Sequence, residues 1–438
     1  MKDNATTLKK TLLAIVLGAL MLPLIQQHVT LLVRKSLKGA IVPKQKPEFS
    51  KRSWWEGTYQ ESYSEWYNEN FGFRADFVRL HNQVAFSLFH LAKANGVIIG
   101  KENYLYEENY IKAYTGKDFI GKPAIDEMTT KLRVLQDSLE KNNITLVVCL
   151  ASGKGSYYPE YIPDIYGPAS EETNYKLMAS SFAEKGVNCI DFNKWFMDMK
   201  NKVPYALYPK TGIHWSRYGS VMVIDSLIKY VEYKRKVDMP NVVWNSIEVS
   251  DTLRSPDADI GEAMNLMFPI TPLENMRYAN FAFEDTTGKS KVSLMSVSDS
   301  FFWSLFDVSL GPNAFSTVDF YYYNNEVYHS DGRPMSQAGS QSGMEDASKH
   351  DVVMIMATEA NLWGLGWGFI NTAFDHFVVH KMVRANDELV QSYEAEIRKS
   401  EKWMQDIKLK ADAAGISLDS MIYLDAKYMA DERLKNGQ

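Results

Sequence analysis

The chain has 438 residues, enough for one large domain with attachments or for two to three smaller domains. Hydrophobic residues make up 45% and charged residues 23%, so a packed globular core is expected. The formal net charge of −6 excludes the dominant basic field that nucleic-acid binding needs. The two cysteines, Cys149 and Cys189, fall in strand-like runs and are interpreted as buried free thiols, with a disulfide between neighbouring strands as the alternative.

The N-terminus resembles a signal sequence. Two lysines precede an apolar run from Leu12 to Ile25, and no small-x-small cleavage site follows it. The run can be extended to Val33, which gives roughly the 20 residues that a bilayer requires. We therefore predict that residues 1–33 form an uncleaved signal anchor or transmembrane segment, with most of the protein outside the cytoplasm. Cleavage and secretion is the alternative.

Residues 34–110 are predicted to form a linker, a helical segment and a hairpin. The first part, 34–52, is basic and contains proline, as linkers often do. Apolar residues then recur at three- and four-residue spacing, at Phe73, Phe77, Leu80 and Val84, which indicates an amphipathic helix. The run 97–106 reads as a β-hairpin that turns at 100–103.

Residues 111–380 show the alternation of strands and helices that is typical of a layered α/β domain. Continuous apolar runs predict strands buried on both faces of a parallel sheet, at 144–150, 292–297 and 351–356. Helical spacing separates them, at 128–140, 174–184 and 218–230. The stretch 237–282 is irregular and is interpreted as an insertion or lid.

The composition changes after about residue 381. Residues 388–413 are charged and helical, and a second helical piece covers 418–434. We interpret 381–438 as a helical tail, which is either solvated or serves as an oligomerisation or docking arm.

Two motifs carry possible chemistry. Ser300 follows the strand at 292–297, and the turn after a strand can project a hydroxyl while the next helix start offers backbone N–H groups to an oxyanion. A helix-capping serine is the alternative, because serine is a preferred cap. A serine hydroxyl needs an adjacent base. Among the eight histidines, His214 is the best placed, at a loop-to-helix junction before Trp215.

These motifs, with two further blocks, resemble the SGNH-hydrolase-like alginate O-acetyltransferase family. Asn70–Arg74 followed by 99–106 resembles the family's opening block, and 151–163, with its Tyr-Pro-Glu-Tyr-Ile-Pro, resembles the next. Gly212–Trp215 and Ser298–Phe301 resemble the blocks that hold the histidine and the serine. The histidine also precedes the serine, as in that family. The resemblance implies an SGNH-like parallel sheet flanked by helices.

One departure bears on activity. The family's aspartate two residues before the histidine is Gly212 here, so the carboxylate that orients the imidazole is missing from the motif. Three alternatives follow: a Ser–His dyad, a carboxylate from elsewhere such as Asp299 or Glu359, or an inactive binding protein. By analogy with SGNH folds, Asn361 is the candidate for oxyanion support.

Other site residues are less well defined by the sequence. Lys154 and Arg217 are candidate ligands for an acidic sugar, or else surface charges near the end of the sheet. The sequence has no metal-ligand set and no phosphate-binding glycine loop, and we predict no cofactor.

The resemblance implies O-acyl transfer, of acetyl by analogy, to an exported polysaccharide or cell-envelope glycan. Ser300 would attack the acyl donor and His214 would take its proton. The resemblance also implies a location on the periplasmic side of the bacterial inner membrane and a membrane-bound O-acyltransferase partner. The alternatives are an inactive SGNH-like glycan-binding or assembly subunit of an export machine, and an anchored acyl esterase.

Overall fold

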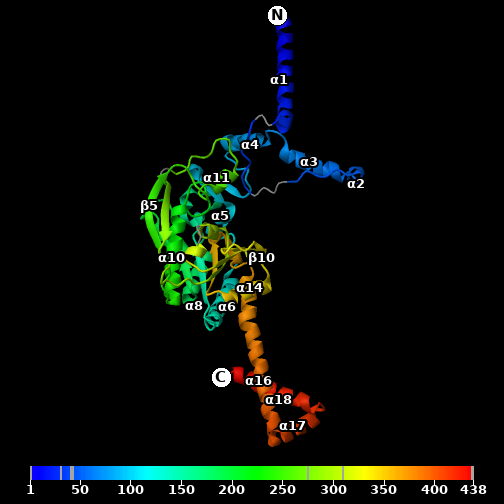
Figure 1. Ribbon diagram of the computed structural model, residues 1–438, viewed down its shortest axis with the longest axis vertical. Coiled ribbons are helices and arrows are strands. Elements are labelled where there is room, and N and C mark those ends of the chain that lie inside the picture. The colour runs from blue at the N-terminus through cyan, green and yellow to red at the C-terminus, as the bar shows by residue number, and fades with distance from the viewer. Residues whose placement is uncertain (1, 30–31, 40–43, 274–275, 308–309, 436–438) are drawn as a thin grey trace.

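The structure is a computed structural model that describes the whole chain except residues 1, 30–31, 40–43, 274–275, 308–309 and 436–438. Each of the predicted segments 1–33, 34–110, 237–282 and 381–438 therefore contains a few residues outside the described ones. The described chain has a central α/β domain, from which helices extend at both ends (Figure 1).

A seven-stranded sheet with the order β10-β9-β8-β7-β11-β3-β4 forms the centre of the domain. Its strands are β3 (Thr145–Ala151), β4 (Cys189–Asp191), β7 (Leu294–Ser298), β8 (Val318–Tyr322), β9 (Glu326–His329), β10 (Ser336–Gln337) and β11 (Val352–Thr358). The five strands from β8 to β4 are parallel, whereas β9 and β10 are antiparallel additions at one edge. The predicted SGNH-like α/β fold is confirmed, with one correction: the sheet is mixed.

The parallel strands are buried on both faces, as their continuous apolar runs predicted. Along β3, Leu146, Val148 and Leu150 lie in one hydrophobic cluster, while Val147 and Cys149 lie in the other. Successive side chains of a strand point to opposite faces, so one strand supplies both cores. Cys149 and the half-buried Cys189 are free thiols on neighbouring strands.

Helices cover the two faces of the sheet. Residues of α6 (Lys122–Glu140), α8 (Asn174–Lys185) and α15 (Phe369–Phe374) belong to one cluster. Residues of α9 (Phe192–Met199), α10 (Arg217–Arg235), α12 (Trp303–Phe306) and α13 (Leu310–Asn313) belong to the other. The other short helices of the domain are α5 (Glu108–Tyr114), α7 (Lys154–Tyr157), α11 (Asp259–Ala263) and α14 (Ser340–Lys349). The 3-10 helices are η1 (Lys101–Asn103), η2 (Pro159–Tyr161), η3 (Asp164–Tyr166), η4 (Ser300–Phe302) and η5 (Glu359–Gly364), and η6 (Asp375–Val379) is a π-helix.

Two hairpins lie outside the main sheet. The first pairs β1 (Val97–Ile99) with β2 (Leu105–Glu107), where the sequence predicted a hairpin. The second pairs β5 (Val242–Ser250) with β6 (Met276–Phe283), and α11 belongs to the segment of chain that connects these two strands. The sequence analysis expected the stretch 237–282 to be irregular. It is instead built on an antiparallel hairpin.

The N-terminal helix α1 (Lys2–Val29) extends away from the domain (Figure 1). Its part Thr6–Val29 is long and apolar enough to cross a membrane and is not buried against the protein, although a signal sequence has the same properties. At its base follow α2 (Lys51–Trp55), α3 (Thr58–Asn70) and α4 (Arg74–Phe89). At the opposite end, α16 (His380–Lys399), α17 (Glu401–Ala414) and α18 (Leu418–Lys435) form an arm with a small apolar core of its own.

Candidate active site

Ser300 lies where β7 ends and η4 begins, at the carboxyl edge of the parallel strands. The preceding residue, Asp299, fixes this turn: its carboxylate accepts hydrogen bonds from Phe301 N (3.1 Å) and from the Thr358 N–H (2.8 Å) at the end of β11. Two adjacent strand ends are thus joined by one buried carboxylate. Ligands of open α/β sheets bind at this edge, so the position suits a nucleophile.

His214 is held in place by the residue that follows it. The Trp215 indole is fully buried, and its Nε1–H donates to Ser304 Oγ at 2.6 Å, one turn beyond Ser300. The indole also packs edge-on against Phe301, with the ring centroids 5.0 Å apart. Ser216 then caps α10, accepting from Gly219 N at 3.1 Å. The loop with the histidine and the turn with the serine are therefore locked to each other.

The two residues that the sequence paired do meet. The distance from His214 Nε2 to Ser300 Oγ is 2.9 Å, which is hydrogen-bonding distance. The other ring nitrogen, Nδ1, lies 2.5 Å from Oδ2 of Asp259. With the Nδ1–H donating to Asp259, Nε2 keeps the lone pair that can accept the serine proton. This is the order of groups in a Ser–His–Asp triad.

Asp259 is the carboxylate that the sequence analysis missed, and it comes from the β5–β6 insertion. It opens α11, and its Oδ1 also accepts from the backbone N–H of Ile213 at 2.9 Å. Gly261 N donates to Thr211 O at 2.8 Å, which binds the insertion to the histidine loop a second time. Nothing in the pattern of 251–266 marks Asp259, because its partner lies 45 residues earlier in a different loop.

Gly212 allows this close approach. A Cβ at position 212 would lie 2.8 Å from the carbonyl oxygen of Asp257 and 2.8 Å from Pro209 Cγ. Real Cβ atoms do not come so close to backbone, so any side chain at 212 would push the insertion away. The absence of a side chain at position 212 therefore makes room for the insertion that supplies the carboxylate.

The charges around His214 favour its protonated form. Burial of the imidazole lowers its pKa, but the hydrogen bond and charge of Asp259, assisted by Asp299 and Glu107, outweigh burial and raise the pKa above its usual value. Burial, together with the charge of Asp259, also raises the pKa of Glu107. The site thus favours an imidazolium, which is the state a histidine reaches when it accepts a proton.

Lys154, predicted to be either a ligand for an acidic sugar or a surface charge, is not at the surface. Its side chain is fully buried, and Nζ donates to the carbonyl oxygens of Lys210 (2.9 Å) and Gly212 (2.6 Å). Burial lowers its pKa to about 7. Lys154 therefore fastens the backbone just before His214 to the end of β3.

The two carboxylates proposed for the triad do not contact His214. Asp299 is used in the turn described above, and Glu359 accepts from Asn193 Nδ2 at 2.7 Å in a buried position. Burial raises the pKa of Glu359 to about 7. Neither Asp299 nor Glu359 is therefore the partner of the imidazole. Asp259 makes the hydrogen bond to His214 Nδ1.

The remaining predicted residues lie at or beside this edge. Asn361, proposed for oxyanion support, donates its Nδ2–H to Asp299 Oδ2 at 2.9 Å, so that amide proton is already engaged. Arg217 opens α10, and its backbone N–H donates to Asp257 Oδ1 at 3.2 Å. Tyr323 was not predicted: burial raises the pKa of its hydroxyl, and hydrogen bonding to Ser300 works against that rise. Among the described residues no group of three or more metal-ligating side chains gathers.

The mixed sheet, with a serine at the carboxyl edge of a strand and a histidine facing it, has the SGNH-like α/β fold. Residues 97–249 match the family model described as the SGNH hydrolase-like domain of the acetyltransferase AlgX. The predicted resemblance is confirmed over this segment, which contains His214 but neither Ser300 nor Asp259.

The solved structures that this chain resembles are distant in sequence. The O-acetyltransferase domain of Pseudomonas putida AlgJ is 14% identical, covers 64% of this chain and 99% of its own, and superposes with a TM-score of 0.41. Pseudomonas aeruginosa AlgX is 14% identical over 63% of this chain and 67% of its own, with a TM-score of 0.40. Bacillus cereus PatB1 with a sulfonyl adduct is 13% identical over 63% and 99%, also at 0.40. The comparison with curated proteins finds no match.

Proposed function

We propose that this protein is an O-acyltransferase, of acetyl by family resemblance, that modifies an exported polysaccharide or cell-envelope glycan through an acyl-serine. The observation that carries the proposal is the single histidine that bridges Ser300 Oγ and the Asp259 carboxylate. The match to the acetyltransferase family over 97–249 supports the class of reaction.

In the first half of the reaction, Ser300 Oγ attacks the carbonyl carbon of the acyl donor while its proton passes to His214 Nε2. The imidazolium is stabilised by Asp259. When the bond between the acyl carbon and the donor's leaving oxygen breaks, that oxygen takes the proton from His214. The products are the acyl-serine and the released alcohol or other leaving group.

In the second half, a sugar hydroxyl is the nucleophile. It attacks the acyl-serine carbonyl and gives its proton to Nε2, and the acyl carbon leaves Ser300, which takes the proton back from His214. Water in place of the sugar would make the same steps an ester hydrolysis. The distinction between transferase and esterase therefore depends on which acceptor reaches this edge of the sheet.

We also propose that α1 attaches the protein to the periplasmic face of the bacterial inner membrane. A membrane-bound O-acyltransferase would supply the acyl group. Two observations support it: Thr6–Val29 is long and apolar enough to span a bilayer, and α11, which carries Asp259, lies on the side of the domain from which α1 leaves (Figure 1). A donor at the membrane surface would then reach the site directly.

A serine-directed fluorophosphonate tests the nucleophile in the full chain. We expect it to label the protein covalently, Ser300→Ala to abolish the labelling, and Ser298→Ala, a buried serine two residues earlier, to keep it. Absence of labelling in folded protein would contradict the proposal and favour an inactive glycan-binding or assembly subunit.

The acceptor is tested with p-nitrophenyl acetate as donor and alginate or chitin oligosaccharides as acceptors. Mass spectrometry should show oligosaccharides that have gained an acetyl group, and Ser300→Ala should remove this product. Release of acetate with every oligosaccharide unmodified would replace the transferase with an anchored esterase.

A further inference from the structure

Helix α4 presents its apolar side outward. Phe77, Leu80, Val84 and Leu88 recur along one face at spacings of three and four residues, and they are 43–72% exposed. The opposite face is the buried one and carries Asn82 and Ala85. A surface helix in water shows the reverse order, with its apolar stripe toward the protein. The stripe is thus poorly matched to water.

The stripe points away from the domain. Asn82 Nδ2 donates to the carbonyl oxygen of Met264 at 2.8 Å, and Gln83 Oε1 accepts from Phe268 N at 2.9 Å, so the polar side of α4 is fixed on the α11 loop. In Figure 1, α4 lies across the base of α1, between that helix and α11. The apolar stripe is therefore turned toward the side on which α1 leaves the domain.

The turn before α4 is fastened to the end of α1. Gly72 is packed so closely against it that an added Cβ would clash with the carbonyl oxygen of Pro23 and the side chain of Gln26. Gln26 in turn bonds both backbone groups of Leu32, donating to its oxygen at 2.7 Å and accepting from its nitrogen at 3.0 Å. This level is where the apolar sequence of α1 gives way to Gln26, Gln27 and His28.

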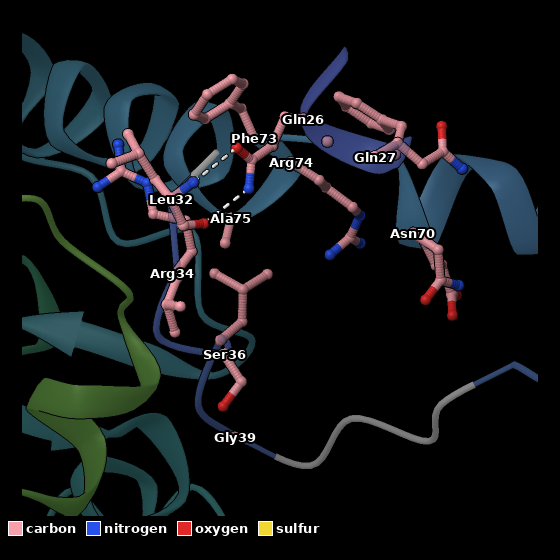
Figure 2. Close-up of a pocket in the computed structure, with 15 residues that line it drawn as sticks. Gln26, Gln27, Leu32, Arg34, Ser36, Gly39, Asn70, Phe73, Arg74 and Ala75 are labelled. Atoms are coloured by element: carbon pink, nitrogen blue, oxygen red, sulfur yellow. Dashed lines mark hydrogen bonds between the residues drawn. The ribbon is translucent and has the colours of Figure 1, made fainter. Parts of the chain in front are cut away.

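The same level holds a hollow that is lined in part by arginines. A pocket of about 740 Å³ lies between the end of α1, the segment 32–39 and the α3–α4 turn, and Arg34 and Arg74 line it (Figure 2). From Arg34 to Arg52 the sequence has seven Lys and Arg residues and a single acid, Glu48, although the whole chain carries a net charge of −6. Four of these cations form ion pairs with acids outside the segment, and the other three are lysines. Anionic lipid headgroups attract such segments.

We propose that α4 is a membrane-interface helix, which lies in the headgroup region of the bilayer with its stripe, Phe77, Leu80, Val84 and Leu88, against the acyl chains. Amphipathic helices bind lipid surfaces in this way. The partner is the lipid surface itself, and α4 would hold the α11 loop, and with it the active site, close to the membrane. The inference does not depend on the chemistry of Ser300.

Lipid quenching of a fluorophore tests the depth of α4. Single cysteines at Leu80 or Leu88 in the full chain are labelled with the dye NBD, and the protein is placed in vesicles of equal phosphatidylcholine and phosphatidylglycerol containing doxyl-labelled lipid. Leu20→Cys in α1 is the reference inside the bilayer, and Leu409→Cys in α17, also an exposed leucine, is the matched control. Unmutated protein measures any labelling of Cys149 and Cys189, and circular dichroism checks folding.

We expect quenching at positions 80 and 88 to be several-fold stronger than at 409 and comparable to that at 20. Quenching at 20 with none at 80 and 88 would overturn the interface helix and leave the anchor standing. Absence of quenching at all four positions would overturn both. A dye at 80 that is shielded from water but not quenched by lipid, and that becomes exposed on dilution of the protein, would overturn the proposal in favour of a second copy.

Discussion

In the described part of the chain, Asp–His groups lie at both ends of the sheet, and the two groups differ in their further partners. At the carboxyl edge, His214 joins Asp259 to Ser300. Toward the amino end of β8, Asp319 Oδ1 is 2.8 Å from His329 Nδ1 and accepts from Arg333 at 2.8 Å. His350 Nε2 lies 3.5 Å from the other oxygen of Asp319.

The two groups differ in what their histidines face. The ion-pair partners of Asp319, which are His329, Arg333 and His350, all offer nitrogen atoms, and Asp319 is only 2% exposed. The group therefore links β8, β9 and the end of α14 inside the protein. His214 instead presents its second nitrogen to a hydroxyl at the edge where ligands of α/β sheets bind. The third member is the Ser300 hydroxyl in the His214 group and the Arg333 guanidinium in the Asp319 group. This difference distinguishes the candidate active site from the structural cluster.

Among variants that leave Ser300 in place, Asp259→Asn should have the largest effect. We expect the rate of acyl transfer to fall roughly 10²- to 10⁴-fold, because the imidazole loses the carboxylate that orients it. Since Asp259 raises the His214 pKa, its removal lowers that pKa, and the acid limb of the pH–rate profile should move to lower pH. An unchanged rate and an unmoved acid limb would show that Ser300 and His214 act as a dyad.

Lys154→Met should have the next largest effect. The variant removes the two hydrogen bonds that hold the carbonyls of Lys210 and Gly212, so the histidine loop loses its attachment to β3. We expect kcat to fall roughly 10- to 100-fold, as small misplacements of catalytic groups do, with KM for the donor nearly unchanged. A rise in KM with kcat intact would instead return Lys154 to the role of substrate ligand.

Glu107→Gln should have a smaller effect on the same site. Glu107 contributes to the raised pKa of His214 through its charge alone, after the larger contributions of Asp259 and Asp299. We expect the acid limb to shift to lower pH by less than Asp259→Asn shifts it, with the rate at its plateau preserved. A shift to higher pH would contradict the electrostatic assignment.

Asp319→Asn is the matched control, with no expected effect on catalysis. An asparagine amide would face nitrogen donors that now share a buried carboxylate, which should lower the free energy of unfolding by about 1–3 kcal/mol. Thermal unfolding and fluorophosphonate labelling measured on the same sample separate the two effects. Loss of labelling in folded Asp319→Asn protein would remove the distinction between the clusters.

Much of the sheet follows from sequence pattern alone. The runs 144–150, 292–297 and 351–356 are β3, β7 and β11 to within two residues at each end, because strands buried on both faces are continuously apolar. Strands β8, β9 and β10 were missed: β8 carries Asp319 among tyrosines, and β10 has only two residues. Such short or polar strands are defined by their neighbours in the sheet.

The candidate site likewise contains residues that the sequence predicts and residues that it does not. Ser300 and His214 could be paired from the sequence because each sits at a recognisable junction of elements. Asp259 could not, since it lies in a loop without periodicity and is brought to His214 by the docking of the insertion. Lys154 was misassigned because lysine is rarely buried, and only its two carbonyl partners explain why it is here.

The crowding around Gly212 also limits how this sequence can diverge. An aspartate at 212 and the present path of residues 257–259 exclude each other, because a Cβ there would collide with the Asp257 carbonyl. The carboxylate can come from position 212 or from Asp259, and these two solutions are epistatic. A single substitution from one toward the other leaves the site either overcrowded or without a carboxylate. A motif search that requires the aspartate beside the histidine would discard chains of this kind, although their acid is supplied from 45 residues farther along.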